Sequence, residues 1–345
     1  MTKIDLKRTE KYAFLIFLAA VVLFTVGAWD RIFAASVFGL RFLWIYPVLV
    51  VLLALILFLY IGRMKRAQVS GKKCAGLFFL QTMHKYRFLI EQLVQRDFKI
   101  KYKRSVLGAF WSFLNPLLMM TVQYVVFSHL LNIRGNTEHY AIYLLCGIVM
   151  WNGFNDCSTQ SMRSITSNAA LITKVYVPKY IYPVTRVLSA SINIVLSMIP
   201  LLLVTTVYGL FSTPHLYLSK AVLLLPFGLL LMLIFCVGMG FFLSSLMVFF
   251  HDIEFLWGFV STLWMYATPI IYSLSMFEEK GVMWFVKLEQ FNPLYHYIQF
   301  IRTIVLERQS PAFSEYGICL AFSVGLFLLG FFMFRKVQDR FILYL

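Results

Sequence analysis

The sequence has few charged residues, and most of those it has are basic. Only 13% of its 345 residues are Asp, Glu, Lys or Arg, against about 25% in a typical soluble domain. Hydrophobic residues make up 61%. This composition excludes a disordered chain and argues against a soluble globular enzyme. The net charge of +16 could indicate nucleic-acid binding, but membrane proteins also collect Lys and Arg on one side.

The motifs of common catalytic and metal sites are also missing. The five cysteines are scattered without a CxxC pair, so the sequence predicts neither a disulfide framework nor a zinc site. No G-x-x-x-x-G-K-[ST] stretch occurs, so we expect no nucleotide-binding loop. Asp252 and Glu254 form a D-x-E pair that could hold a metal, although a helix-start cap fits it better. We therefore predict no catalytic residue, metal or cofactor in this chain.

Long apolar runs are abundant, and a membrane span needs about 20 such residues. Eight runs qualify as candidate spans: 12–29, 42–62, 105–133, 140–155, 187–219, 221–250, 255–277 and 316–334. A ninth, 290–301, is too short to cross and is expected to be interfacial or re-entrant. The first run is longer than a signal-peptide core and lacks a clear cleavage site, which favours a retained span. The sequence thus predicts an all-α polytopic membrane protein with eight transmembrane helices.

The basic residues orient these spans. Eight spans place both termini on one side, and the segments on that side hold 23 of the 31 Lys and Arg residues, which leaves 8 on the other side. The positive-inside rule assigns the richer side to the cytoplasm. The surplus charge therefore predicts cytoplasmic termini and requires no nucleic acid as a partner.

Two parts are expected along the chain. Residues 1–82 would form a two-span hairpin followed by a basic linker, and 83–345 a six-span unit. The six-span unit begins with an amphipathic segment, 83–104, whose apolar and basic faces suggest a helix lying in the membrane interface. It could be only an anchor, or a rim that meets anionic lipid or a partner protein. Asp97 interrupts the apolar face, and Lys101 at i+4 is its expected partner.

Polar and aromatic residues inside the spans are the remaining clues. Asp156 shares one helical face with Asn152 and Arg163. This indicates either a polar helix end, with Asp156 paired to Arg163 or to a neighbour, or the wall of a pathway. Aromatic faces beside polar groups suit sugar rings, although packing alone could explain each one. The channel-lining candidates are Tyr124, Trp151, Asn152, Asp156, Trp264, Tyr266 and Tyr272.

Five stretches together resemble a known family. They are RDFKIKYKRSVLGAFWSFLNPLL (96–118), SNAALITKVYVPKYIYPVTRVLSA (167–190), FFHDIEFLWGFVSTLWMYATPIIY (249–272), NPLYHYIQFIR (292–302) and FRKVQDRFILYL (334–345). In this order, from about residue 83 onward, the chain resembles the membrane permease of type-2 ABC exporters for polysaccharides and polyol phosphates. That family serves O-antigen, capsule and teichoic acid export.

The resemblance implies a bacterial cytoplasmic-membrane permease that forms a homodimer and works with two copies of a separate ATPase subunit, which binds ATP and Mg. The cargo would be a lipid-linked glycan, such as a polymer on polyprenyl diphosphate, and 281–308 would form outer re-entrant helices. The ATPase-coupling residues would be Lys174, Val175, Tyr176, Pro178, Lys179, His251 and Asp252. The rim that meets the lipid head group would contain Arg96, Lys99, Lys103 and Arg104.

Departures from the family pattern keep alternatives open. His251 replaces a usual Arg, Thr268-Pro269 replaces Ser-Pro, and the hairpin 1–62 lies outside the six-span plan. One rival is a type-2 ABC exporter of a small molecule or lipid. Another is a polytopic enzyme acting on lipid-linked sugars through an outer carboxylate. A secondary transporter is disfavoured because buried charge is scarce.

Overall fold

The computed structural model is helical and describes residues 6–34, 36–37, 40–70, 75–103, 105–130, 139–212 and 219–345. Within these ranges, five helical stretches are long and apolar enough to cross a membrane: Glu10–Gly27, Phe110–Leu130, Ile181–Phe211, Lys220–Phe249 and Phe313–Leu343. They coincide with five of the eight predicted spans. The count of eight stays a prediction.

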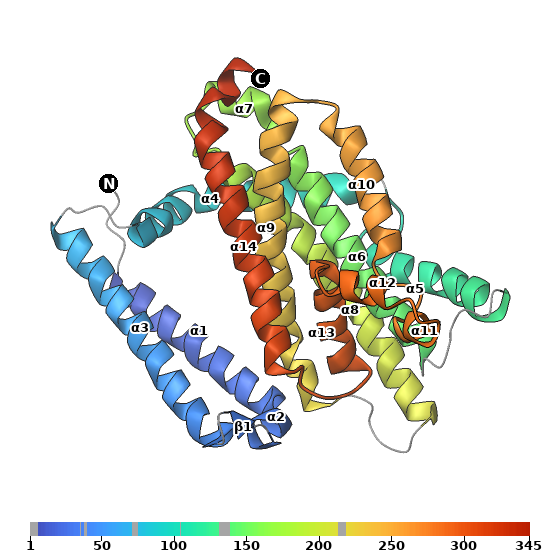
Figure 1. Cartoon of the computed structure of the whole chain (residues 1–345). Coiled ribbons are helices and arrows are strands. Elements are labelled where there is room, and N and C mark those ends of the chain that lie inside the picture. Colours follow the sequence, from blue (N-terminus) through green and yellow to red (C-terminus); the bar gives the residue numbers. More distant parts are fainter. Residues whose placement is uncertain are drawn as a thin grey trace.

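The N-terminal part forms a helical hairpin, and its role as a separate two-span domain stays a prediction. It contains α1 (Leu6–Gly27), α2 (Trp29–Ala34), β1 (Ser36–Val37), β2 (Leu40–Arg41) and α3 (Phe42–Ser70). The two short strands pair antiparallel at the turn. The hairpin meets the bundle near α2, while the rest of α1 and α3 runs apart from it (Figure 1). Phe24 packs edge-on against Phe227 and Tyr316 at this junction.

The amphipathic segment is a helix, and it is longer than predicted. It forms α4 (Ala75–Tyr102), which crosses the long helices of the bundle (Figure 1). Leu93 is buried, and Tyr86, Leu89 and Ile90 pack beside it. Lys85, Arg96, Lys99 and Lys103 are exposed. The apolar and basic faces therefore lie as the sequence predicts.

The bundle follows from α5 onward. Its long elements are α5 (Phe110–Tyr124) with the π-helix η1 (Val125–Leu130), α6 (Tyr140–Met162), α8 (Ile181–Ser212), α9 (Leu225–Phe249) and α14 (Phe313–Val337). The helices α9 and α14 lie side by side (Figure 1). Gly238 and Gly330 allow this contact, because a Cβ on Gly330 would stand 2.1 Å from the Gly238 carbonyl oxygen.

One predicted span is shorter than the sequence suggested. The run 255–277 forms α10 (Ile253–Ala267), and this helix ends before Thr268 and Pro269. A residue that precedes proline disfavours the helical conformation, and Thr268 is extended at φ −68° and ψ 133°. Fifteen residues cover about 22 Å, less than the roughly 30 Å of the hydrocarbon core. The prediction of one continuous helix over 255–277 is therefore wrong.

Short helices complete the chain at both ends of the bundle. They are η2 (Thr166–Asn168), α7 (Ala169–Lys174), η3 (Lys220–Leu224), α11 (Ser275–Glu279), α12 (Met283–Glu289), α13 (Pro293–Val305) and η4 (Gln338–Leu343). The run 290–301 is helical within α13, whose 13 residues are too few to span. Whether it re-enters the membrane stays a prediction. The helices α7 and η4 and the α9–α10 turn lie at the same end (Figure 1).

Two hydrophobic cores organise the bundle. The larger is built mainly from α6, α8, α9 and α13, and includes Phe154, Phe235 and Tyr297. The smaller gathers Leu93 of α4, Ile181 of α8 and Phe341 of η4 at the end that carries α7. Because the smaller core joins distant segments, α4, the α7–α8 loop and η4 form one packed unit.

Candidate functional site

A cavity of about 710 Å³ lies between α5, α6, α8 and the α10 region. Aromatic, amide and hydroxyl side chains share its wall with aliphatic ones. Its lining includes Tyr102, Trp111, Ser112, Asn115, Gln123, Trp151, Asn152, Asn155, Asn193, Ser197, Tyr266, Thr268 and Tyr272. Such a wall combines apolar ring faces with hydrogen-bonding groups, and it suits a ligand that has both kinds of surface.

Several of the amides have no protein partner. Within the described residues, the side-chain amides of Asn115, Asn152 and Asn155 make no hydrogen bond, and the buried Oε1 atom of Gln123 accepts none. Polar side chains at membrane depth are costly when unsatisfied. These amides therefore need water or the hydroxyl groups of a ligand in the cavity.

The cavity wall is electrically neutral overall. Its only charged lining residues are Lys101 and Asp156, and the Lys101 Nζ donates to Asp156 Oδ2 at 2.9 Å. Their side chains are 40% and 42% exposed. The predicted Asp156–Arg163 pair is wrong, because Arg163 reaches Glu254 of α10 instead. Lys101 comes from α4, so this partner could not be read from the spacing along α6.

Five of the seven channel-lining candidates border this cavity. They are Trp151, Asn152, Asp156, Tyr266 and Tyr272. The other two lie elsewhere. Tyr124 packs against His129 and Tyr140. Trp264 donates from Nε1 to Asn292 Oδ1 at 2.9 Å, and so links α10 to the start of α13. Their role as channel-lining residues stays a prediction.

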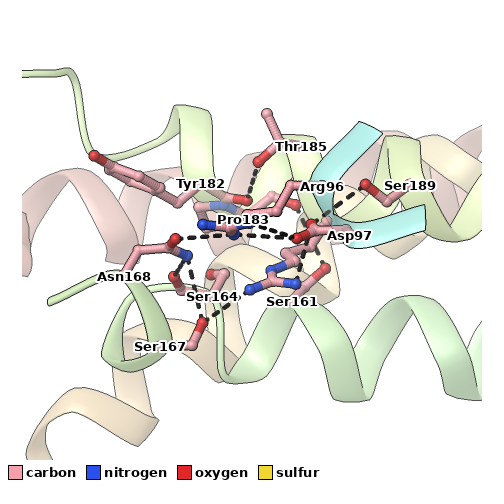
Figure 2. A network of polar contacts seen from close by, with 11 residues as sticks. Arg96, Asp97, Ser161, Ser164, Ser167, Asn168, Tyr182, Pro183, Thr185 and Ser189 are labelled. Atoms are coloured by element: carbon pink, nitrogen blue, oxygen red, sulfur yellow. Dashed lines mark hydrogen bonds and ion pairs between the residues drawn. The ribbon is translucent and has the colours of Figure 1, made fainter. Parts of the chain in front are cut away.

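A charged network lies beside the cavity, where α4 meets α8. Figure 2 shows Asp97 at its centre with Arg96, Asn168 and Ser189 close by. Asp97 is 5% exposed and accepts from Arg96 at 3.1 Å and from Arg186 at 3.0 Å. The predicted Asp97–Lys101 pair is therefore wrong, because the two arginines take Asp97 and Lys101 takes Asp156.

A second cavity of about 480 Å³ adjoins this network. Arg96, Lys101 and Arg186 line it together with Asp97, so basic groups outnumber acidic ones three to one. Lys101 and Asn193 line both cavities. The neutral cavity thus adjoins a positively charged one at the end where Lys101 and Asn193 lie.

The other rim candidates lie further out on α4. Lys99 and Lys103 are exposed and line neither cavity, and Arg104 lies outside the described residues. The sequence analysis did not select Arg186, although it is a basic residue immediately before the apolar run 187–219. It also missed Asn115 and Asn193, whose signal was an amide within a predicted span.

The first group of coupling candidates forms an exposed loop between α7 and α8. Lys174 and Val175 are exposed, and Tyr176 is 94% exposed. Pro178 follows at an intermediate position, and Lys179 turns inward to donate to the Gln338 carbonyl oxygen at 2.6 Å. Burial lowers the pKa of Lys179, and Asp339 partly offsets this effect.

The second group lies in the turn between α9 and α10. His251 and Asp252 are both exposed. Asp252 occupies the position before α10, but its side chain makes no capping hydrogen bond. Asp252 therefore occupies the predicted capping position, but the expected hydrogen bond from its side chain is absent. Figure 1 places this turn at the same end as α7, so the two groups of candidates share one end of the bundle.

At the end of the bundle opposite α7, two titratable side chains, Glu289 and His296, have shifted pKa values. Burial raises the pKa of Glu289, and a hydrogen bond from Asn292 Nδ2 at 2.9 Å counteracts this. His296 is buried between Glu315 and the Gln290 carbonyl. Burial alone would lower its pKa, but these two hydrogen bonds outweigh burial and raise it.

Comparisons with known proteins agree with this architecture. The chain is 28% identical over 262 residues to the O-antigen export system permease protein RfbA of Myxococcus xanthus, covering 76% of this chain and 97% of that protein. It is 30% identical over 254 residues to the RfbA protein of Klebsiella pneumoniae, covering 73% and 93%. The capsule polysaccharide export inner-membrane protein BexB of Haemophilus influenzae is 21% identical over 264 residues, covering 75% and 94%.

A family profile covers most of the bundle. The profile described as ABC-2 type transporter matches residues 89–306, which is well over half of the chain. This range begins within α4 and ends after α13, so it contains both cavities. The chain is a multi-pass membrane permease and belongs to the ABC-2 type transporter family.

Proposed function

We propose that this permease exports a lipid-linked polysaccharide from the cytoplasmic side of a bacterial inner membrane. The observation that carries the proposal is the neutral cavity, whose unpartnered amides and aromatic rings lie at membrane depth. The names of the relatives, which are O-antigen and capsule polysaccharide export proteins, support it.

The chemistry of the cavity favours a glycan. Sugar rings present apolar C–H faces to Trp111, Trp151 or Tyr266, and their hydroxyls bond to the amides. The lining carries one positive and one negative group, which neutralise each other. A wall without net charge favours an uncharged glycan over a polyanionic polymer of the teichoic-acid type.

The charged cavity fits the lipid end of the same cargo. A diphosphate attached to a polyprenyl chain would meet Arg96, Lys101 and Arg186, with Lys99 and Lys103 on the exposed face of α4. Arginine donates two parallel hydrogen bonds to phosphate oxygens, which suits this role. We propose that the head group enters here while the sugars enter the neutral cavity.

The energy would come from a separate ATPase. The sequence has no P-loop, and family membership implies an ATPase partner. We propose that two ATPase copies contact the loop around Tyr176 and the turn at His251, and that two permease chains form the pathway. This arrangement puts the ATPase and both termini on the cytoplasmic side, where the basic residues are expected.

Depleting the protein in its native bacterium tests the cargo directly. We expect a lipid-linked glycan to accumulate in the cytoplasmic leaflet, and mass spectrometry of the lipid extract should identify its sugars and its diphosphate. Normal surface glycan with no accumulated glycolipid would contradict the proposed function.

Replacing Tyr176 with Ala tests the coupling. We expect ATP hydrolysis by the purified complex to continue while glycan export falls, because Tyr176 is almost fully exposed and supports no core. The control is Phe211→Ala, since Phe211 is 87% exposed at the opposite end of α8. Equal export by both variants would remove Tyr176 from the coupling surface.

A further inference from the structure

After Thr268, whose N–H makes the last helical hydrogen bond of α10 to the Trp264 carbonyl, the chain crosses the outer end of the neutral cavity as non-helical backbone. Thr268, Ile270, Ile271 and Tyr272 line the cavity. Lys101 and Asp156 line its other end, and on α6 about 20 Å of helix separates Asp156 from Tyr143, which contacts this crossing. Non-helical backbone at membrane depth must find partners for its carbonyl groups. We call residues 268–272 the outer segment.

Three side chains supply those partners, and they take four consecutive carbonyls. Tyr140 donates to the Ile271 carbonyl at 2.6 Å, and Tyr143 donates to the Tyr272 carbonyl at 2.7 Å. Arg302 donates from Nη1 to the Pro269 carbonyl at 2.8 Å and from Nη2 to the Ile270 carbonyl at 3.1 Å. Side chains of α6 and α13 therefore hold these four carbonyls, while the Tyr272 hydroxyl ties the segment back to the Ala267 carbonyl of α10.

Arg302 is unusual in having no acidic partner among the described residues. It is 2% exposed, and its guanidinium lies 3.4 Å from the centre of the Tyr143 ring. Every hydrogen bond it makes goes to a backbone carbonyl, including that of Tyr143 at 3.3 Å. A buried guanidinium is expensive to desolvate, so a purely structural role would be served more cheaply by a neutral donor.

A glycine makes room for this contact. A Cβ on Gly147 would stand 2.8 Å from Ile270 Cγ2 and 3.2 Å from Arg302 Nη2. Any larger residue at position 147 would push the outer segment and the guanidinium apart. The close approach thus involves two helices, α6 and α13, and the non-helical outer segment between them.

We infer that Arg302, with Tyr140 and Tyr143, is a positioning residue that locks the outer segment across the cavity. The segment is the outer closure of the pathway, and cargo leaves only when its four carbonyls are released together. This inference rests on the proposed transport function for its purpose. The hydrogen bonds that hold the segment, which we call the lock, exist in the protein at rest. Their effect can therefore be measured in an assay that involves no transport.

Labelling of an introduced cysteine measures the lock. Ile270 is 4% exposed, so Ile270→Cys should react slowly with a membrane-impermeant maleimide added outside intact cells. We expect Tyr143→Phe, or Tyr140→Phe with Tyr143→Phe, to raise the labelling rate about tenfold, the scale of one or two lost hydrogen bonds. Arg302→Lys, which keeps the charge and loses the fork, should raise it at least as much.

The matched control is Tyr297→Phe. Tyr297 is as buried as Tyr140, but its hydroxyl bonds to Cys319 and Ser323, away from the outer segment. Its loss should leave labelling unchanged. Unchanged labelling in the Tyr143 and Arg302 variants, or an equal rise with Tyr297→Phe, would overturn the inference. If the lock variants label faster but no glycan accumulates on depletion, the lock stands and the proposed cargo fails.

Discussion

The two ends of the neutral cavity are closed by different kinds of interaction. At the inner end, Lys101 and Asp156 form an ion pair whose side chains are each about 40% exposed. At the other end, Arg302 and two tyrosines hold carbonyl groups through hydrogen bonds that are buried or partly buried. A half-exposed ion pair contributes little, whereas leaving a buried carbonyl without its donor costs the desolvation of that group. We therefore expect the end at Lys101 and Asp156 to open more easily than the end at Arg302.

The largest expected effect is the loss of the buried guanidinium. Arg302→Met should lower the free energy of unfolding by about 3–5 kcal/mol, because three carbonyls lose their donors in a buried site. Thermal unfolding of the purified protein measures this. The control Lys287→Met removes an exposed outer basic residue and should cost less than about 0.5 kcal/mol. Equal unfolding temperatures for the two variants would contradict the claim that the buried hydrogen bonds of Arg302 stabilise the fold.

The wall between the two ends should affect transport and not stability. Tyr266→Ala removes a ring that lines the cavity and is 62% exposed. We expect export to fall about tenfold, since stacking on one ring contributes roughly 1 kcal/mol or more, while unfolding is unchanged. Phe259→Ala, on the same helix and outside the lining, is the control. If export falls with Phe259→Ala and not with Tyr266→Ala, the cargo contacts the other face of α10.

The ion pair between Lys101 and Asp156 should affect export through the signs of its charges, with little effect on the free energy of unfolding. Lys101→Asp places two carboxylates together, and we expect export to fall several-fold with less than about 1 kcal/mol lost in unfolding. Adding Asp156→Lys restores an opposite pair and should restore much of the export. Export assays on the two variants test this. Failure of the double variant to recover would show that the position of each charge matters, and not only the pairing.

The smallest effect concerns pH at the outer end. The folded-state pKa of His296 is raised, so its protonated form stabilises the fold. This contribution is fully present below the unfolded value near 6.5 and is lost as pH rises through the folded pKa. Unfolding curves between pH 6 and 9 should show the free energy of unfolding declining as pH rises, because the neutral imidazole loses its charged hydrogen bond to Glu315. Glu315→Gln should flatten the profile, and an unchanged slope would assign the pH dependence to another group.

The sequence predicted the helices better than their ends. Runs of apolar residues located the long helices because burial in lipid requires them, and the amphipathic period located α4. It missed that α10 stops at Ala267, although Thr268-Pro269 was a readable signal. The apolar residues after Pro269 have the hydropathy of a continuing span. Hydropathy measures side-chain polarity only, so it does not show where a helix ends.

The charged pairs could not be predicted, because their partners are far apart in the sequence. Lys101 lies 55 residues from Asp156, and Arg186 lies 89 residues from Asp97. Helical spacing favours partners at i+4, and tertiary packing overrides that weak preference. Arg302 ends the stretch NPLYHYIQFIR (292–302), but nothing in the sequence revealed that this residue is buried against carbonyl groups.

The contact between Lys179 and Gln338 bears on how the protein is made. The loop that carries Tyr176 is synthesised first, and its backbone partner at Gln338 follows 159 residues after Lys179. At ribosomal speeds of about 5–20 residues per second, that interval is roughly 8–32 s. Phe341 closes the same small core against α4 and the loop. A nascent chain thus lacks the finished surface for a cytoplasmic partner until residues 338–341 have emerged, so the order of synthesis delays assembly until the permease is nearly whole.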